Sequence, residues 1–542
     1  MDLLKAAADW IAQDPDPETK TELKALLEQQ DMSALADRFS KTLEFGTAGL
    51  RGELGAGPNR MNRIVVARAA RAIGQFLINA GDTYANKDGE LSVVIGYDAR
   101  INSDIFAKDS AEVLSAMGLR VHLFDRPVPT PVTAFTGKDL SASAAIMVTA
   151  SHNPPRDNGY KVYLGGPNGH SQLVSPADAE IAHHIQQISE THTFGELQKS
   201  NNYEVIGDAQ ISRYVARALE LDKVESSDLK IAYTPLHGVG WAIVEPILDA
   251  LGYKNVETVQ AQVKPDGTFP TVAFPNPEEN GAMDLAFETA TRVQADIVIA
   301  NDPDADRLAV AIPSAGSWRM LTGDEIGLLL GEQVAKSGAQ GNFANSIVSS
   351  DLLGKVAEHY RLGFAQTLTG FKWISKTPNL SYGYEEALGY CVDPRHTPDK
   401  DGITAAVMIL GLARELKNSG SSIATHLTAL SERYGFVQTG QISIRVQDLS
   451  IIKKIMQSLR DSTPNKLGHW EVEYEDLKLG LKLPPTDGVV FENSEIRVII
   501  RPSGTEPKLK CYLLARGDSA DAAEENLGQL KEAANSLLSA LQ

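Results

Sequence analysis

Short apolar runs of strand length recur along the chain, each followed by a polar loop, a helical pattern, a glycine and a second strand-like run. The pattern occurs three times. We expect first strands at 92–98, 230–234 and 346–350, helices at 111–116, 244–251 and 352–360, and second strands at 121–124, 256–259 and 364–367. Gly118, Gly252 and Gly363 stand where a helix end favours a left-handed residue. Because strand–helix–strand units form parallel sheets with right-handed crossovers, the pattern predicts three related doubly wound α/β domains.

The two ends of the chain differ from this repeat. Within residues 1–40, Leu23, Leu26 and Leu27 lie at helix spacing, which predicts a polar-faced helical cap on the first domain. Near the other end, strands expected at 495–500 and 509–514 flank a short turn and precede an amphipathic helix at 520–541, as is typical of an antiparallel α+β domain. We therefore predict four domains, at 1–210, 211–325, 326–438 and 439–542.

Composition changes this picture mainly by exclusion. A chain of 542 residues is too long for one core, and no apolar run approaches the ~18 residues of a membrane span. The start, residues 1–5, lacks the basic and apolar regions of a signal peptide. Cys391 and Cys511 lie far apart, which indicates neither a disulfide nor a zinc site. The two distant cysteines suggest a reducing compartment, so we expect a cytoplasmic protein. The net charge of −19 argues against nucleic acid and anionic membranes as partners.

One serine follows an apolar stretch directly. The run 144–148 reads as a buried strand, and the loop Thr-Ala-Ser-His-Asn-Pro at 149–154 places Ser151 at its carboxyl end. Ligands collect at this end of the strands in open α/β sheets. Lys161 brings an amine near the same loop. Ser151 is either a covalent phosphate carrier or a turn residue, and its own loop does not decide between them.

Three carboxylates at alternating positions, Asp302, Asp304 and Asp306, follow a second apolar run at 296–300. Such a loop can direct oxygen ligands at one hard divalent cation, and Mg²⁺ suits it best. A calcium-binding EF-hand is excluded, because Arg307 and residue 313 stand where that loop requires Gly and Glu. The alternative interpretation is a solvated, helix-capping acidic turn.

Other loops carry weaker signals. The loop 501–508 offers an arginine, two hydroxyls and a glycine, which are donors for a phosphate dianion or the ordinary residues of a hairpin turn. The paired glutamates in 384–389 suit sugar hydroxyls, although adjacent glutamates are common on surfaces. The stretches 369–372 and 45–52 contain glycines that let the backbone approach a ligand, and His237 is more typical of a structural histidine.

Taken together, these motifs resemble the α-D-phosphohexomutase superfamily of phosphoglucomutases and phosphomannomutases. Five loops carry the resemblance in the family's order, namely those at 46–52, 149–154, 302–307, 384–389 and 501–507. The forms Tyr-Glu-Glu-Ala-Leu-Gly and Phe-Gly-Thr-Ala-Gly-Leu-Arg, with the chain length, are similar to the phosphoglucomutase-2/phosphopentomutase branch. The resemblance implies three related doubly wound α/β domains and a C-terminal α+β domain around a central cleft. It also implies a phosphosugar mutase that works through a bound 1,6-bisphosphate.

By this resemblance, Ser151 would be the phosphoserine and, with Asp302, Asp304 and Asp306, would hold Mg²⁺. The residues around the transferring phosphate would be Arg51, Lys161 and Arg307. Lys161 would act as acid and base if burial or neighbouring cations lower its pKa. A phosphorylated monosaccharide would be the partner, a sugar 1,6-bisphosphate the activator, and the protein a monomer or homodimer.

The resemblance also implies a set of substrate-binding residues. Arg501, Ser503, Gly504 and Thr505 would grip the phosphate that does not react, with Lys400 assisting, and Glu385, Thr369 and Gly370 would contact the sugar. Ala387 stands where many glucose- and mannose-specific relatives carry Ser, which leaves room for a pentose. Glucose 1-phosphate and glucose 6-phosphate are the expected pair. Mannose or ribose phosphates, sugar 1,6-bisphosphate synthesis and non-catalytic phosphosugar binding are the alternatives.

Overall fold

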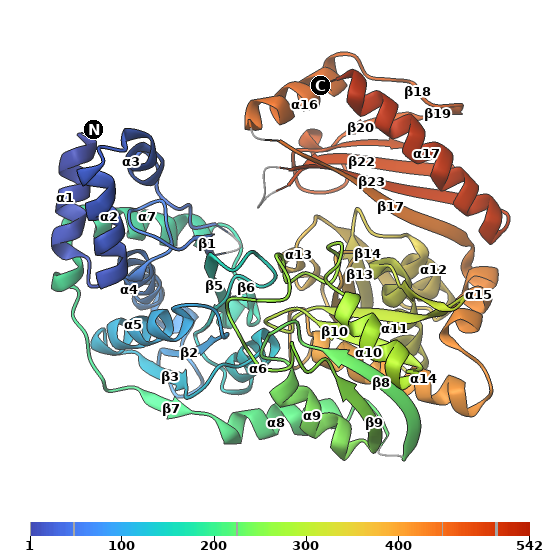
Figure 1. The fold of residues 1–542 in the computed structure, drawn as a ribbon, viewed down its shortest axis with the longest axis horizontal. Helices are drawn as coiled ribbons and strands as arrows, with labels where there is room; N and C mark the ends of the chain where they lie inside the picture. The colour runs from blue at the N-terminus through green and yellow to red at the C-terminus, as the bar shows by residue number, and fades with distance from the viewer. Residues whose placement is uncertain (1, 47–48, 224–225, 447, 504–507, 542) are drawn as a thin grey trace. The chain divides into compact units, whose positions relative to one another are not determined.

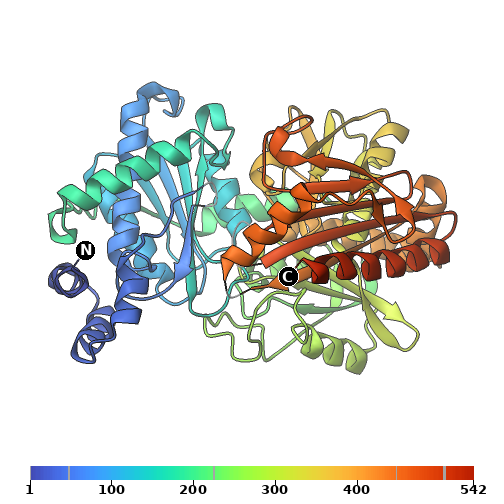
Figure 2. The same ribbon diagram turned by 90° about the horizontal axis from the view of Figure 1, so that it is seen from above.

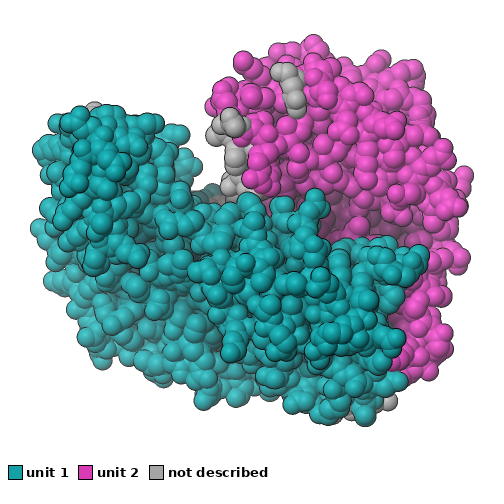
Figure 3. Space-filling view, viewed as in Figure 1, with its two compact units in different colours: residues 1–320, 389–414 teal, residues 321–388, 415–542 magenta. Residues whose placement is uncertain are grey.

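A computed structural model describes residues 2–46, 49–223, 226–446, 448–503 and 508–541. The chain forms two compact units, coloured separately in Figure 3. Unit 1 comprises Met1–Met320 with Gly389–Arg414, and unit 2 comprises Leu321–Leu388 with Glu415–Gln542. The four domain boundaries expected from the sequence stay predictions. Within the described ranges, no helix is both long and apolar enough to cross a membrane.

Three short helices form the expected N-terminal cap (Figure 1). They are α1 (Leu3–Gln13), α2 (Pro17–Glu28) and α3 (Met32–Phe39). Each begins after an aspartate whose carboxylate accepts hydrogen bonds from the first free backbone N–H groups of the helix. Trp10, Leu23 and Phe39 pack into a small core beneath them.

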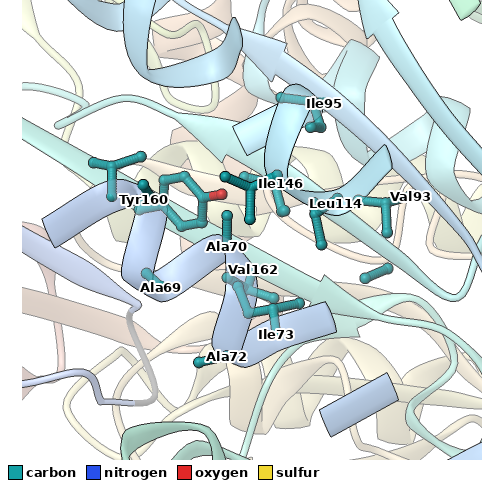
Figure 4. Close-up of a cluster of buried hydrophobic side chains, with 14 of the residues drawn as sticks. Ala69, Ala70, Ala72, Ile73, Val93, Ile95, Leu114, Ile146, Tyr160 and Val162 are labelled. Carbon is teal, nitrogen blue, oxygen red and sulfur yellow. The ribbon is translucent and has the colours of Figure 1, made fainter. Parts of the chain in front are cut away.

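The first α/β domain in unit 1 contains a mixed sheet of order β1-β5-β4-β2-β3-β7, with β6 paired to β5. Its strands are β1 (Leu50–Glu53), β2 (Ser92–Tyr97), β3 (Arg120–Phe124), β4 (Ala144–Val148), β5 (Asp157–Leu164), β6 (Ser171–Gln172) and β7 (Glu204–Ile206). Its helices are α4 (Arg63–Ala80), α5 (Ser103–Ala116), α6 (Thr130–Asp139) and α7 (Ala177–Thr191), and α8 (Asp208–Leu219) follows β7 and leads into the second domain. Figure 4 shows part of its core, where Ile73 of α4 packs with Val93, Ile146 and Val162 of the sheet.

The second domain in unit 1 repeats this plan with a sheet of order β12-β11-β10-β8-β9. Its elements are β8 (Ser227–Thr234), α9 (Trp241–Ala250), β9 (Tyr253–Thr258), α10 (Asp284–Val293), β10 (Ile297–Asn301), β11 (Leu308–Ser314) and β12 (Ser317–Met320). Unit 1 also includes β16 (Gly389–Cys391) and most of α14 (Gly402–Asn418). A backbone bridge from Arg307 to Gly389 fastens this later segment beside β11.

Unit 2 contains a third α/β domain and the C-terminal domain. The first comprises α11 (Gly323–Lys336), β13 (Asn342–Ser346), α12 (Leu352–His359), β14 (Gly363–Thr367), α13 (Phe371–Ile374), β15 (Leu380–Glu385) and α15 (Ile423–Tyr434). The second comprises β17 (Phe436–Arg445), α16 (Leu449–Asp461), β18 (Lys466–Leu467), β19 (Trp470–Glu471), β20 (Glu473–Asp476), β21 (Val489–Glu492), β22 (Ile496–Pro502), β23 (Lys508–Gly517) and α17 (Ala520–Ala540). Its antiparallel sheet has the order β17-β23-β22-β21-β20, and α17 lies along β23 and β17 (Figures 1 and 2).

The three α/β domains share one strand order, β3-β2-β4, β9-β8-β10 and β14-β13-β15, which confirms the predicted repeat. The sheet β17-β23-β22-β21-β20 confirms the predicted antiparallel fourth domain. Three details of the prediction are wrong. The left-handed residue after α12 is Arg361, with a φ of 57°, and not Gly363. The first two sheets are mixed, because the loops that leave β4 and β10 are too short for a crossover helix and return the chain as antiparallel β5 and β11. The strand expected at 346–350 is Asn342–Ser346, because Phe343 and Ala344 fill the sheet while the serines after them form the turn into α12.

Candidate functional site

Ser151 lies in the turn between β4 and β5, buried, with a positive φ of 51°. A non-glycine residue in this conformation is strained, and such strain persists only where surrounding contacts impose it. Thr149 Oγ1 accepts a hydrogen bond from the Ser151 N–H at 2.8 Å. The Ser151 hydroxyl donates to Asp302 Oδ2 at 2.8 Å and lies 3.1 Å from His152 Nδ1. The loop therefore directs this hydroxyl at the first carboxylate of the acidic loop.

The acidic loop connects β10 to β11, and its three carboxylates converge. Single oxygens of Asp302, Asp304 and Asp306 lie within 4.8 Å of one another, and all three side chains are buried. The Oδ1 atoms of Asp304 and Asp306 are buried without a hydrogen-bond partner, which is costly for a carboxylate unless a cation binds there. An all-oxygen set of this kind fits Mg²⁺. A bound Mg²⁺ would neutralise charge that develops on a phosphoryl group.

Two lysines contact the same carboxylates. Lys161 Nζ lies 2.7 Å from Asp304 Oδ2 and 2.7 Å from Asp306 Oδ2, and Lys400 Nζ lies 3.5 Å from Asp306 Oδ2. Burial lowers the pKa of Lys161, but Asp304 and Asp306 outweigh it and raise this pKa above its ordinary value. The role expected for Lys161 from the sequence, as acid and base, requires a lowered pKa instead. The two ammonium groups, with Arg307, also hold the pKa of Asp306 below its usual range against the effect of burial.

The remaining cations of the site lie on either side of the Ser151 loop. Arg51, on β1, donates to Asn153 Oδ1 at 3.1 Å. Arg307 donates its backbone N–H to Asp302 Oδ1 at 3.0 Å, and its Nε lies 3.8 Å from Asp306 Oδ1. Burial, then Arg307 and Arg51, lower the pKa of His152 well below its ordinary value, so this imidazole is neutral at pH 7. Unit 1 thus combines a hydroxyl, three hard ligands and four cationic side chains, a set suited to an anionic phosphoryl group.

Unit 2 contains the other residues predicted from the sequence. Glu385 is the last residue of β15 and Ala387 follows it, whereas Thr369 and Gly370 precede α13. Arg501 lies in β22 and Ser503 just after it. Gly504 and Thr505 fall outside the described residues.

Within unit 2, the loop after β15 and the end of β22 meet around Tyr512. Burial, then the charge of Glu386, raise the pKa of Tyr512, while Arg501 opposes them. Of the paired glutamates, Glu386 is held by the protein, since its Oε2 accepts hydrogen bonds from Ser346 at 2.9 Å and Ser349 at 3.2 Å.

Sequence reasoning missed three groups that hold the site in place. Thr130, at the start of α6, donates its hydroxyl to Asp304 Oδ2 at 2.5 Å. Arg100 donates to several carbonyls of the Ser151 loop, and His152 contacts the Ser151 hydroxyl. The only available signal was position: Arg100 follows the end of β2, where polar residues of an α/β sheet converge.

Family models match four consecutive segments. They are described as phosphoglucomutase/phosphomannomutase α/β/α domains I, II and III, at residues 42–192, 212–316 and 322–434, and as the C-terminal domain at 444–526. A Haemophilus influenzae protein named "Probable phosphomannomutase" is 44% identical, over 88% of this chain and 98% of its own length. A Homo sapiens protein named phosphopentomutase is 32% identical, over 99% of this chain and 94% of its own. The crystal structure of a phosphoglucomutase/phosphomannomutase family protein from Burkholderia thailandensis superposes with a TM-score of 0.70 at 19% identity, over 92% of this chain and 97% of that one.

Proposed function

Because the chain belongs to the phosphoglucomutase/phosphomannomutase family and is therefore a mutase of the phosphohexomutase type, an isomerase, we propose that it interconverts the 1- and 6-phosphates of a hexose. Glucose is the first candidate sugar. One observation carries the proposal: the buried Ser151 hydroxyl lies 2.8 Å from Asp302, within a triad of carboxylates and beside cationic side chains. A phosphoryl group on Ser151 would lie among these charges.

The proposed reaction has two matched phosphoryl transfers. In the first, the free hydroxyl of the sugar phosphate attacks phosphoserine 151, the bond from phosphorus to Oγ breaks, and a sugar bisphosphate forms. In the second, the Ser151 hydroxyl attacks the other phosphate of the bisphosphate and the isomeric monophosphate leaves. Asp302, Asp304 and Asp306 would hold Mg²⁺, which would supply charge stabilisation for both transfers.

The protons have distinct candidate acceptors. Neutral His152, with Nδ1 3.1 Å from Ser151 Oγ, can accept the proton that Ser151 loses in the second transfer once the hydroxyl turns from Asp302 to this nitrogen. Lys161 remains the candidate for the proton of the sugar hydroxyl. It would have to lose its own proton first, which the two facing carboxylates oppose. Arg51 and Arg307 would bind the oxygens of the transferring phosphoryl, and Lys400 would assist.

In unit 2, we propose that Arg501, Ser503, Gly504 and Thr505 bind the phosphate that is not reacting. Glu385, together with Thr369 and Gly370, would contact the sugar.

A pentose phosphate is the second candidate substrate, and two observations favour it. Ala387 offers no hydroxyl beside Glu385. The human relative, which matches 99% of the chain, is named phosphopentomutase.

A substrate panel tests the function. Purified protein with Mg²⁺ is given glucose 1-phosphate, mannose 1-phosphate or ribose 1-phosphate, each with a trace of the matching bisphosphate. We expect turnover, with the highest kcat/KM for glucose 1-phosphate. A higher value for ribose 1-phosphate would select the second candidate, and no turnover of any sugar would refute both. Ser151→Ala is the matched variant: it should fold normally and lose several orders of magnitude in kcat, whereas near-normal turnover would refute the phosphoserine.

A further inference from the structure

The guanidinium of Arg100 donates hydrogen bonds to four backbone carbonyls in and next to the Ser151 loop. Its Nη2 donates to the carbonyl oxygens of Ser151 and Asn153, both at 2.6 Å. Its Nη1 donates to those of Pro154 at 2.8 Å and Asp157 at 3.0 Å. Four carbonyls within one short loop therefore face the same cation. The Pro154 carbonyl also accepts from the Asp157 N–H at 3.0 Å, so the guanidinium matters most for the carbonyls of Ser151 and Asn153.

The guanidinium is itself held from two sides. Asp98 Oδ2 lies 3.5 Å from Arg100 Nε, and Asp98 Oδ1 accepts from the Arg100 N–H and the Ser103 hydroxyl. On the other side, the Arg100 guanidinium carbon lies 4.8 Å from the centre of the Phe269 ring. Arg100 is 3% exposed, so these contacts are shielded from water and correspondingly strong.

Phe269 belongs to the second domain, in the long loop between β9 and α10. Close approach of that loop to Arg100 requires a glycine: a Cβ on Gly267 would lie 2.5 Å from the Ala99 carbonyl oxygen and 2.7 Å from Arg100 Cα. The second domain thus supplies both the acidic loop that faces Ser151 and the ring that covers the arginine behind it. The Ser151 loop therefore meets the second domain twice, through its own hydroxyl at Asp302 and through Arg100 at Phe269.

We propose that Arg100 is a positioning residue for phosphoryl transfer, which keeps the strained Ser151 turn in the conformation that directs Oγ at Asp302. The inference rests on the proposed function, because it assigns Arg100 a role through Ser151. Arginine is required because its flat fork reaches four acceptors at once, whereas a lysine ammonium offers three donors from one point. Losing the fork leaves buried carbonyls unpaired and lets the turn relax.

The test measures transfer to Ser151 directly. Wild-type protein and Arg100→Lys, both dephosphorylated, are mixed with Mg²⁺ and glucose 1,6-bisphosphate carrying ³²P, and labelling of Ser151 is followed in a single turnover. A displacement near 1 Å costs about 100-fold in rate, so we expect labelling and kcat to fall by about 10- to 100-fold in Arg100→Lys. The KM for the sugar phosphate should change less than about threefold, because Arg100 contacts no substrate.

Arg68→Lys is the matched control. Arg68 is also buried, lies 5.7 Å from the Trp10 ring centre and donates to the His192 carbonyl, away from Ser151. It should lower the thermal midpoint without slowing labelling, whereas equal slowing in both variants would show a general effect of losing a buried arginine and overturn the inference. If Arg100→Lys does not fold, Phe269→Leu takes its place with an expected loss of about three- to tenfold, and an unchanged rate would overturn the inference.

The proposed function and the positioning role of Arg100 can be refuted separately. If wild-type Ser151 takes no label from glucose 1,6-bisphosphate or, in a parallel reaction, from ribose 1,5-bisphosphate, the proposed function is refuted and the role of Arg100 with it. If wild type is labelled and Arg100→Lys is labelled equally fast, the function stands and the positioning role is refuted. A rise in KM with an unchanged labelling rate would also refute it, because it would place Arg100 in substrate binding.

Discussion

Thr130→Val tests whether the first domain orients a metal ligand of the second. Thr130 begins α6 and is buried. Its hydroxyl donates to Asp304 Oδ2 at 2.5 Å, and its backbone N–H donates to the Asp304 carbonyl at 2.9 Å. Valine has nearly the same shape, so the substitution removes the hydroxyl bond and leaves the backbone bond in place.

The expected loss of Mg²⁺ affinity depends on the contacts that Asp304 retains in the variant. A hydrogen bond to a charged group contributes about 1.5–3 kcal/mol. Oδ2 of Asp304 retains its contact with Lys161 at 2.7 Å, so the carboxylate does not become an isolated buried charge and the lower end applies. A loss of about 1.5 kcal/mol is about tenfold in an equilibrium constant. We therefore expect Thr130→Val to bind Mg²⁺ about tenfold more weakly, within the range known for residues that orient metal ligands.

Isothermal titration calorimetry of Mg²⁺ into the protein measures this without turnover, and the increase in thermal midpoint with Mg²⁺ is an independent readout. Thr133→Val is the matched control, because Thr133 is a buried threonine of the same helix whose hydroxyl has Met147 Sδ, at 3.3 Å, as its one hydrogen-bond partner among the described residues. It should bind Mg²⁺ within about twofold of wild type, since sulfur is a weak acceptor. Unchanged affinity in Thr130→Val, or the same loss in both variants, would refute the reasoning.

Three further predictions concern other parts of the molecule. In Gly323→Ala the new Cβ would lie 1.8 Å from the Glu386 carbonyl oxygen, so urea unfolding should show a loss of about 1–3 kcal/mol in unit 2, whereas Gly528→Ala, in open space on α17, should show none. Ala387→Ser should raise the ratio of kcat/KM for glucose 1-phosphate over ribose 1-phosphate about three- to tenfold, and an unchanged ratio would exclude this position from sugar choice. Burial raises the pKa of Asp401 to about 6, so the folded protein retains a proton that the unfolded chain releases, and stability should fall as the pH rises from about 4 to about 6. Asp401→Asn should remove this dependence and be more stable than wild type at pH 7.5 but not at pH 4, and an equal difference at both pH values would contradict the assignment.

The parts of the site that the sequence could predict are those encoded locally. Asp302, Asp304 and Asp306 alternate in one loop, and a strand before them forces that loop to the sheet edge, so their convergence follows from spacing alone. The strand before Ser151 is predictable for the same reason. The first strand of the third domain shows the limit of such local prediction. It was expected at 346–350 but is Asn342–Ser346, because small and polar residues on both sides do not mark where strand pairing stops.

Contacts between distant segments could not be predicted. Thr130 reaches Asp304 across 174 positions and Lys161 reaches it across 143, and neither pair leaves a trace in local periodicity. Lys400 lies in the segment Gly389–Arg414, which packs within unit 1 beside Asp306 although it follows residues 321–388 of unit 2 in the chain. The direction of the pKa shift of Lys161 depends on these contacts too, because burial and the carboxylates act in opposite senses and only distances decide between them.

The repeat explains why Ser151 and Asp302 meet. Each α/β domain places its third strand beside the first, and the Ser151 loop leaves β4 as the acidic loop leaves β10, at equivalent positions of equivalent sheets. Both loops return the chain as an antiparallel strand within a few residues, so each stays close to its strand end. The loop with Glu385 leaves β15, the equivalent strand of the third domain. The same topological position therefore presents a hydroxyl in the first domain, a set of carboxylates in the second and a pair of glutamates in the third. The proposed nucleophile, metal and sugar roles thus differ because the loop sequences differ, while the fold is the same.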